Sequence, residues 1–145
     1  MTLDSVRPEI RWAIEAAQDK KALNLVVLKL GKLAAFAESF LVCSGESDPQ
    51  MRAIGDEIEE RLARHNVRPE HREGRPGSEW MLLDFGAFVV HIFTERARLY
   101  YDLERLWRSA ERLDIPENGL PDSGADSTGR RQSSATNRDS DLSPS

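Results

Sequence analysis

The chain has 145 residues, 39% of them hydrophobic, with a formal net charge of -5 and a pI of about 5.3. A chain of this length holds one domain with extensions, and its core needs no disulfide or metal. The acidic balance repels phosphate backbones, so it excludes broad nucleic-acid binding without a local basic patch. Cys43 is the only cysteine, which excludes an internal disulfide and is typical of a reducing compartment.

The amino-terminal residues show no targeting signal. They lack a basic region followed by an apolar run, so no signal peptide is predicted. The longest apolar runs of the chain are also far too short for a membrane span. We therefore expect a cytoplasmic protein without a membrane partner.

The first part of the chain predicts a helix and two strands. Apolar residues at helical spacing predict a helix over 5–19, and Pro8 is tolerated in its first turn. An apolar, β-branched run closed by Gly31 predicts a buried strand over 24–30. After a short crossing, a second apolar run predicts a strand over 39–43.

The middle of the chain predicts a second helix between two loops. Residues 44–47 are expected to be loop, and Asp48 followed by Pro49 is typical of a helix start, with the acid as the cap. Asn66 favours a left-handed helix end, and a weak strand is expected over 67–72. The residues expected on the buried face of this helix are Met51, Ile54, Ile58 and Leu62.

Two strands of matched length and a last helix complete the predicted domain. Segments 79–85 and 87–93 flank the single Gly86, which indicates a tight β-hairpin. The last helix is expected to bury Leu99, Leu103 and Leu106, with Trp107 beside them. This order predicts a single α/β domain with a mixed sheet of about five strands flanked by helices.

The composition changes sharply near Pro116. From residue 117 to 145 the chain is rich in Ser, Gly, Asp, Arg and Pro and holds few apolar residues. Such a segment cannot bury enough surface to offset the entropy of ordering it. We therefore expect a domain over 1–116 and a disordered polar tail over 117–145.

The motifs of nucleotide and metal sites are missing. No GxxxxGK[ST] or GxGxxG sequence occurs, so the loop before the second predicted helix is interpreted as a plain loop. His65, His71 and His91 are scattered without the spacing of metal ligands. We expect neither a metal nor a cofactor.

Two candidate catalytic residues also favour structural roles. Cys43 lies in an apolar strand and is expected to be a small core residue. Nucleotidyl transfer by two metals needs paired carboxylates on a strand, whereas the neighbour two residues after Asp84 is Gly86. No catalytic residue is therefore assigned.

One strand of the predicted hairpin carries a candidate docking face. Strand alternation sets Trp80, Leu82 and Asp84 on one face and the apolar residues between them on the other. An exposed face with apolar and charged residues is typical of protein docking, although the last helix could instead cover it. His91 either is a satisfied sheet histidine or lines a groove, and Tyr100 could extend the face.

Six segments of the chain match, in order, the pattern of a known family. The most specific are EWMLLDFG at 79–86, VVHIF at 89–93 and YDLERLW at 101–107. The other three are NLVVL at 24–28, FLVCSG at 40–45 and QMRAIGD at 50–56. Together they resemble the ribosomal silencing factor family, also called the Iojap family. The resemblance covers roughly residues 5–110 and leaves the tail outside.

The resemblance implies an α/β domain related to nucleotidyltransferase folds but without that activity. It implies binding to the large ribosomal subunit through ribosomal protein fourteen of that subunit. The bound protein would sterically block joining of the small subunit and repress translation in stationary phase or nutrient shortage. No direct nucleic-acid binding is expected beyond minor ribosomal RNA contacts, and a homodimer of the free protein is left open.

The expected partner-binding residues are Trp80, Leu82, Asp84, Phe85 and Gly86, with His91 and Tyr100 as extensions. Trp80 would be the apolar anchor, Asp84 the acceptor for a basic side chain, and Gly86 the turn that presents them. Ala87 stands where an acid is common in the family, which weakens the acidic edge of the hairpin. Lys29 also stands where the family usually has an acid.

Two other functions stay open at this point. A small nucleotidyl- or phosphotransferase on the same fold would bind nucleotide in the presence of magnesium. Direct binding of ribosomal RNA would need a modest basic patch beside the first strand. The residues available for that patch are Lys20, Lys21, Lys29 and Lys32.

Overall fold

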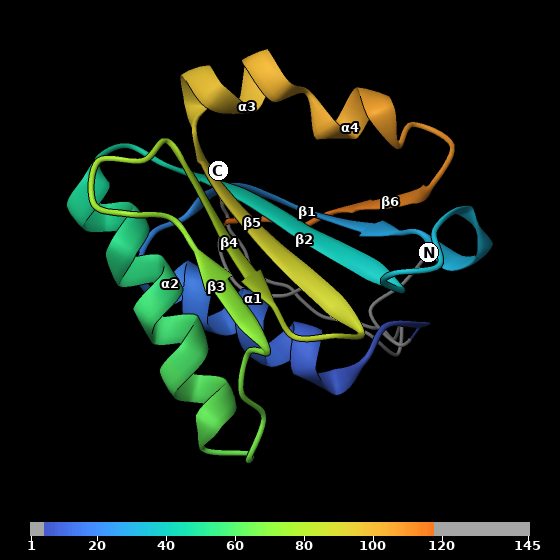
Figure 1. Cartoon of the computed structure of the whole chain (residues 1–145), viewed down its shortest axis with the longest axis horizontal. Coiled ribbons are helices and arrows are strands. Elements are labelled where there is room, and N and C mark those ends of the chain that lie inside the picture. Colours follow the sequence, from blue (N-terminus) through green and yellow to red (C-terminus); the bar gives the residue numbers. More distant parts are fainter. Residues whose placement is uncertain (1–4, 118–145) are drawn as a thin grey trace, which may run out of the picture.

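A six-stranded mixed sheet carries helices on both of its faces in the computed structural model, which describes residues 5–117 (Figure 1). The strand order across the sheet is β3-β4-β5-β2-β1-β6. The expected disordered tail lies outside the described residues, apart from Glu117. In chain order the elements are α1 (Pro8–Asp19), β1 (Leu23–Lys29), the short 3-10 turn η2 (Gly31–Leu33), β2 (Ser39–Gly45), α2 (Asp48–Ala63), β3 (His71–Glu73), β4 (Trp80–Asp84), β5 (Phe88–Thr94), α3 (Glu95–Tyr101), α4 (Leu103–Leu106) and β6 (Glu111–Asp114).

The sheet is mixed because β2 and β5 run parallel while the neighbouring strands pair antiparallel. The chain leaves β2, passes through α2 and the β3–β4 ribbon, and returns beside β2 as β5. Both strands of this parallel pair are almost entirely buried, which explains their continuous apolar sequences. The α/β class predicted from the element order is confirmed.

Helices α1 and α2 pack side by side on one face of the sheet (Figure 1). The predicted buried face of α2 is confirmed, and α1 begins at Pro8 with the proline in its first turn. The opposite side of this core layer is formed by alternate residues of the strands, among them Met81, Leu83 and Val90. No helix between residues 5 and 117 combines the length and apolarity needed to cross a membrane.

The other face of the sheet carries a smaller core under short elements. Phe40, Val42, Val89 and Phe93 form its floor, and Ala97 of α3 packs on them. Trp80 and Leu82 of β4 are only partly buried at the margin of this cluster. The short helices α3 and α4 lie over this face, and Leu99, Tyr100, Tyr101 and Leu106 of these helices are exposed (Figure 1).

The sheet has six strands, not about five, because residues 111–114 form the edge strand β6. β6 pairs antiparallel with β1 from Val26↔Asp114 to Lys29↔Glu111. Its sequence, Glu-Arg-Leu-Asp, has little β-propensity and three charged side chains. Pairing with the free edge of β1 therefore makes it a strand, and its charges suit an edge position.

The single last helix predicted from Leu99, Leu103 and Leu106 is wrong. Asp102 adopts a left-handed conformation with φ of 51° and separates α3 from α4. The helical phase changes at this residue, so Leu99 is 82% exposed and Leu106 is 71% exposed. Leu103 and Trp107 do pack on the smaller core.

Three smaller expectations are corrected. The cap of α2 is Ser47, whose hydroxyl accepts the Gln50 N–H at 3.1 Å, while Asp48 is already helical. β2 extends to Gly45, two residues into the predicted loop. The weak strand near 67–72 is the three-residue β3, and Asn66 has the predicted left-handed conformation.

Candidate docking surface

The predicted β-hairpin is present and Gly86 makes its turn. β4 and β5 pair antiparallel from Trp80↔Phe93 to Asp84↔Val89. Gly86 has φ of 87°, a conformation that L side chains rarely adopt. The Asp84 carboxylate accepts the Gly86 N–H at 2.8 Å, so one of its oxygens stabilises the turn.

The two faces of β4 divide as the alternation predicts. Met81 and Leu83 are buried against the helices α1 and α2. Trp80, Leu82 and Asp84 point to the other face and are each partly exposed. The last helical segment therefore does not cover this strand fully, which leaves an indole and an aliphatic side chain accessible.

Trp80 is held by a hydrogen bond from beneath. Its Nε1–H donates to Nδ1 of His91 at 3.1 Å. His91 is only 4% exposed and lies edge-on to the ring of Phe40, with ring centroids 4.5 Å apart. Of the two roles left open for His91, the structure shows a buried residue of the sheet. The other ring nitrogen, Nε2, has no hydrogen-bond partner among the described residues.

The protonation state of His91 follows from its surroundings. Burial lowers the pKa of His91 from 6.5 to about 4, because an imidazolium would lose its hydration there. The ring is therefore neutral at physiological pH. Since Nδ1 accepts the indole proton, the single ring proton sits on Nε2, and an unsatisfied buried donor of this kind costs about 1–3 kcal/mol.

An aromatic surface continues from Trp80 onto α3. The rings of Trp80 and Tyr101 are 4.6 Å apart, and those of Tyr101 and Tyr100 are 5.0 Å apart. Tyr100 is 80% exposed, and the neighbouring Leu99 and Leu106 are also exposed. We call the exposed side chains of Trp80, Leu82, Leu99, Tyr100, Tyr101 and Leu106 the β4–α3 surface.

A cleft of about 670 Å³ borders Trp80 and Leu82 on the β3 side. The loop between β3 and β4 forms its rim, with Arg72 and Arg75 among the lining residues. The Arg72 guanidinium is held by Glu59 at 2.7 Å and by Asp56 at 2.9 Å. Trp80 therefore lies at the edge of a recess in the surface.

The other expected contact residues lie apart from this surface. Phe85 is 8% exposed, faces the helices and stacks on Phe88 with ring centroids 5.0 Å apart. Asp84 and Gly86 are at the hairpin turn, and Asp84 lies roughly 13 Å along β4 from Trp80. The structure thus brings together Trp80, Leu82 and Tyr100, while Phe85 and His91 could influence docking only indirectly.

The sequence interpretation missed Leu99 and Leu106 as surface residues because it assumed one continuous helix. The signal that could have revealed them is Asp102, since aspartate is one of the few residues that enters the left-handed region. Tyr101 is the link between Trp80 and Tyr100.

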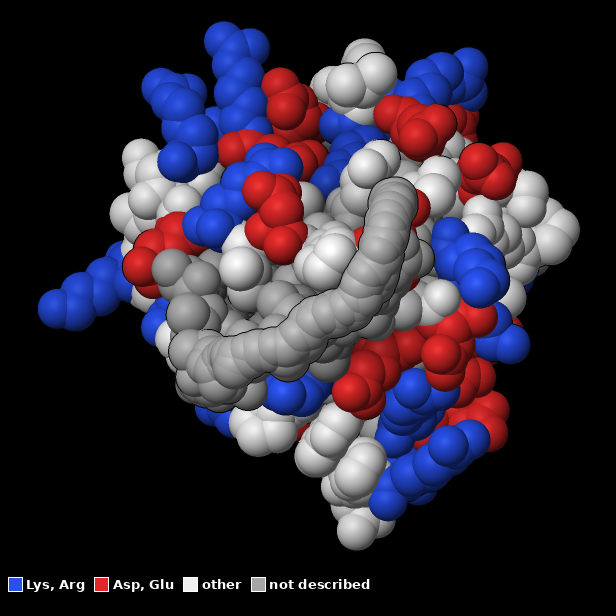
Figure 2. Space-filling model, turned by 180° about the vertical axis from the view of Figure 1, so that it is seen from behind, with Lys and Arg blue, Asp and Glu red and all other residues white. Residues whose placement is uncertain are grey.

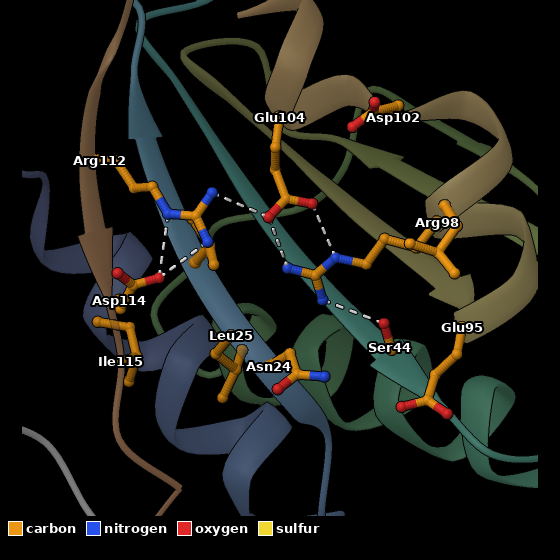
Figure 3. A pocket seen from close by; sticks show the side chains of 12 residues that line it. Asn24, Leu25, Ser44, Glu95, Arg98, Asp102, Glu104, Arg112, Asp114 and Ile115 are labelled. Carbon is orange, nitrogen blue, oxygen red and sulfur yellow. Dashed lines mark hydrogen bonds and ion pairs between the residues drawn. The ribbon is translucent and has the colours of Figure 1, made fainter. Parts of the chain in front are cut away.

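A second cavity, of about 580 Å³, lies at the other end of the sheet and is lined by an ion-pair network (Figure 3). Arg98 contacts Glu104 at 2.9 Å and Ser44 at 3.0 Å, and Arg112 contacts Glu104 at 3.1 Å and Asp114 at 3.0 Å. Hydrogen bonding from Arg98 lowers the pKa of Glu104, which keeps it ionised. The network ties α3 and α4 to β2 and β6.

The acidic side chains of this cavity do not form a catalytic centre. Glu104 and Asp114 are held by arginines, so they are not free to bind a cation. Within residues 5–117 no group of three or more His, Cys, Asp or Glu side chains could hold a metal ion. Cys43 is fully buried, and burial raises the pKa of its thiol to about 12, as suits a core residue.

The basic residues proposed for RNA binding do not form one patch. Lys20 and Lys21 precede β1, whereas Lys29 ends it and Lys32 lies in η2. Six residues of extended strand separate the two pairs by roughly 20 Å. On the face that Figure 2 shows, basic and acidic side chains are interspersed rather than gathered by sign.

Comparison with known proteins agrees with the architecture. The family described as "Ribosomal silencing factor during starvation" matches residues 3–142, further than the motifs alone reach. A ribosomal silencing factor of Bacillus subtilis is 35% identical over 106 residues, which are 73% of this chain and 90% of that protein. The chloroplastic protein Iojap of Arabidopsis thaliana is 29% identical over 117 residues, which are 79% of this chain and 49% of that protein.

A solved structure gives the same result for the fold. The crystal structure of a Chromobacterium violaceum protein superposes with a TM-score of 0.67 at 33% identity, covering 69% of this chain and 83% of that one. The chain thus forms a small α/β domain with exposed and partly exposed apolar side chains on one side of a mixed sheet. The chain belongs to the ribosomal silencing factor family.

Proposed function

We propose that this chain binds the large ribosomal subunit through the β4–α3 surface and blocks joining of the small subunit. The contact on the large subunit would be ribosomal protein fourteen. The observation that carries the proposal is the partly exposed indole of Trp80, which is continuous with Leu82 and with the tyrosines of α3. The names of the relatives support a role in silencing ribosomes.

The chemistry of the surface suits a protein partner. Aromatic and aliphatic side chains with charged residues at the rim are the composition of a docking site, and tryptophan and tyrosine are enriched among its strongest contacts. Asp84 offers one free carboxylate oxygen at the hairpin turn, where a lysine or arginine of the partner could bind. The net charge of -5 also favours approach to a basic ribosomal protein.

The mechanism needs no reaction. A standard interface buries roughly 1,600 Å² in total, an area that a domain of this size can supply. A body bound at the face where the two subunits meet would exclude the small subunit by its volume, and translation would fall. The protein would then act as a regulator rather than an enzyme, without cofactor or metal, in the cytoplasm.

Co-sedimentation with purified large subunits tests the proposal. Trp80→Ala should weaken binding by about 2 kcal/mol or more and should relieve the block on subunit joining in light scattering. Leu33→Ala is the matched control, because Leu33 is an exposed apolar residue of η2 outside the proposed surface. A folded Trp80→Ala protein that binds and blocks like the unchanged chain would remove the surface from consideration.

The oligomeric state is a separate prediction. If a homodimer forms through the same apolar residues, the mass of the free protein measured by light scattering should depend on Tyr100 and Trp80. Binding of large subunits would then compete with dimerisation. A monomer at all concentrations used for sedimentation would contradict the homodimer without affecting the ribosomal proposal.

A further inference from the structure

His91 is an unusual residue for its position. Among the described residues, the buried polar side chains are Ser39, Ser44 and His91. Its neighbours on the same strand are apolar, and its ring lies among those of Phe40, Trp80 and Phe93. An aliphatic or phenyl side chain would fill this space without burying polar atoms. The imidazole is therefore expected to have a role other than packing.

The register of the hairpin gives the imidazole one directed contact. Leu82 is opposite His91, and Trp80 is opposite Phe93. Trp80 is therefore the diagonal neighbour of His91 on the same face of the sheet, a distance that aromatic side chains can bridge. This register allows the Nε1–H of Trp80 to donate to Nδ1 of His91 at 3.1 Å. The hydrogen bond fixes both the tilt of the indole and which of its edges faces His91.

We propose that His91 is a positioning residue that holds the indole of Trp80 in the orientation used for docking. The proposal rests on the function proposed above and assigns His91 no direct contact with the partner. Without the hydrogen bond, the partly exposed indole would be held only by its ring contacts and would have more freedom to lose on binding. Holding it beforehand reduces the entropy lost on association.

The protonation pattern suits this role. Only a neutral ring with its proton on Nε2 can accept the indole N–H at Nδ1. Burial of the ring disfavours the imidazolium, which would have no acceptor nitrogen left. The unpartnered Nε2 is the cost of this arrangement, since the tautomer that serves Trp80 leaves that nitrogen without an acceptor among the described residues.

Two substitutions separate positioning from packing. His91→Phe keeps an aromatic ring of similar volume and removes the acceptor, so affinity for large subunits should fall about two- to tenfold. His91→Gln restores an acceptor oxygen and should recover part of that loss. Trp80→Phe removes the donor, and adding His91→Phe to it should cause no further loss, because the two residues act through one bond.

A spectroscopic measurement on the unchanged chain keeps the inference testable if a variant fails to fold. With ¹⁵N labelling, the Trp80 indole should show a scalar coupling to His91 Nδ1 across the N–H···N bond and slow exchange with solvent. Both should persist in complex with isolated ribosomal protein fourteen.

The results distinguish this inference from the function on which it rests. Folded His91→Phe with unchanged affinity, beside a weakened Trp80→Ala, would overturn the positioning role and leave the docking surface intact. Absence of the coupling would overturn it as well. Unchanged binding by Trp80→Ala would overturn the docking surface itself, and with it the reason for positioning the indole.

Discussion

The carboxylate of Glu70 lies over Gly86 at the turn of the β4–β5 hairpin. A Cβ atom added to Gly86 would be 2.6 Å from Glu70 Oε2, well inside van der Waals contact. The Glu70 N–H also donates to the Asp84 carbonyl at 2.7 Å, which fixes the segment before β3 against the turn. Glu70 therefore supplies an acidic group at the hairpin turn.

Gly86→Ala should destabilise the protein by about 1–3 kcal/mol through backbone strain, while the carboxylate of Glu70, the far end of a flexible and exposed side chain, should move aside at little cost. Gly31→Ala is a matched control, because Gly31 also has positive φ but no atom within 4 Å of an added Cβ. Urea unfolding of both variants would measure the difference. Losses of similar size are expected, and a clear rescue of Gly86→Ala by Glu70→Ala would show instead that the contact with Glu70 is costly.

The buried His91 predicts a dependence of stability on pH. The pKa of His91 in the folded protein, about 4, lies below the ordinary value of 6.5. Between pH 6.5 and pH 4 the imidazole is therefore protonated in the unfolded chain but not in the folded one. The contribution of His91 to the free energy of unfolding should be constant above pH 6.5. It should fall by about 3 kcal/mol on acidification towards pH 4. The group contributes no further change below its folded pKa.

His91→Phe is the control for this pH dependence, since it removes the titrating group and leaves His65 and His71 in place. The difference between the two unfolding curves, measured by urea titration from pH 4 to pH 8, isolates His91. A difference that does not vary with pH would mean that the imidazole is not held neutral by burial.

The main features of the fold were predictable because local chemistry determines them. Alternation along β4 indicates its two faces, and a glycine between matched apolar runs indicates the hairpin, whatever the rest of the chain does. The buried face of α2 follows from helical spacing in the same way. Each of these patterns is complete within a few residues of sequence.

The features that were missed depend on distant partners or on a single dihedral angle. β6 is a strand because β1 offers it a free edge, and nothing in Glu-Arg-Leu-Asp indicates that neighbour. Asp102 breaks the last helix, so leucines at helical spacing are exposed on two separate helices. The bond between Trp80 and His91 requires the hairpin register, which the alternation of one strand does not give.

Glu104 joins α3 and α4 to the edge of the sheet, so Glu104→Gln should loosen the carboxy-terminal part of the domain. Loss of the charge leaves Arg98 and Arg112 without their shared partner, at a cost of about 1–2 kcal/mol, because the network is open to water at the cavity. Hydrogen exchange should rise in β6. Glu60→Gln, in an exposed pair with Arg64, should change stability by less than about 0.5 kcal/mol.

The pKa of Glu104 is lowered chiefly by hydrogen bonding from Arg98, so the stability from this carboxylate is present above its ordinary pKa near 4.5. It should be lost as the pH falls below that value. Glu104→Gln should therefore differ most from the unchanged chain near neutral pH and least in strong acid. A gap that stays constant down to pH 3 would contradict the ion-pair origin of the effect.

Tyr100 tests how far the proposed docking surface extends along α3. Because its ring is mostly exposed, Tyr100→Ala should leave the free energy of unfolding within about 0.5 kcal/mol of the unchanged chain. Binding to large subunits should weaken by about 1 kcal/mol or more if the tyrosine meets the partner. Phe36→Ala is the control, since Phe36 is an exposed aromatic residue beside Trp107 and outside the β4–α3 surface. Equal binding by the two variants would confine the proposed docking surface to β4 and Tyr101.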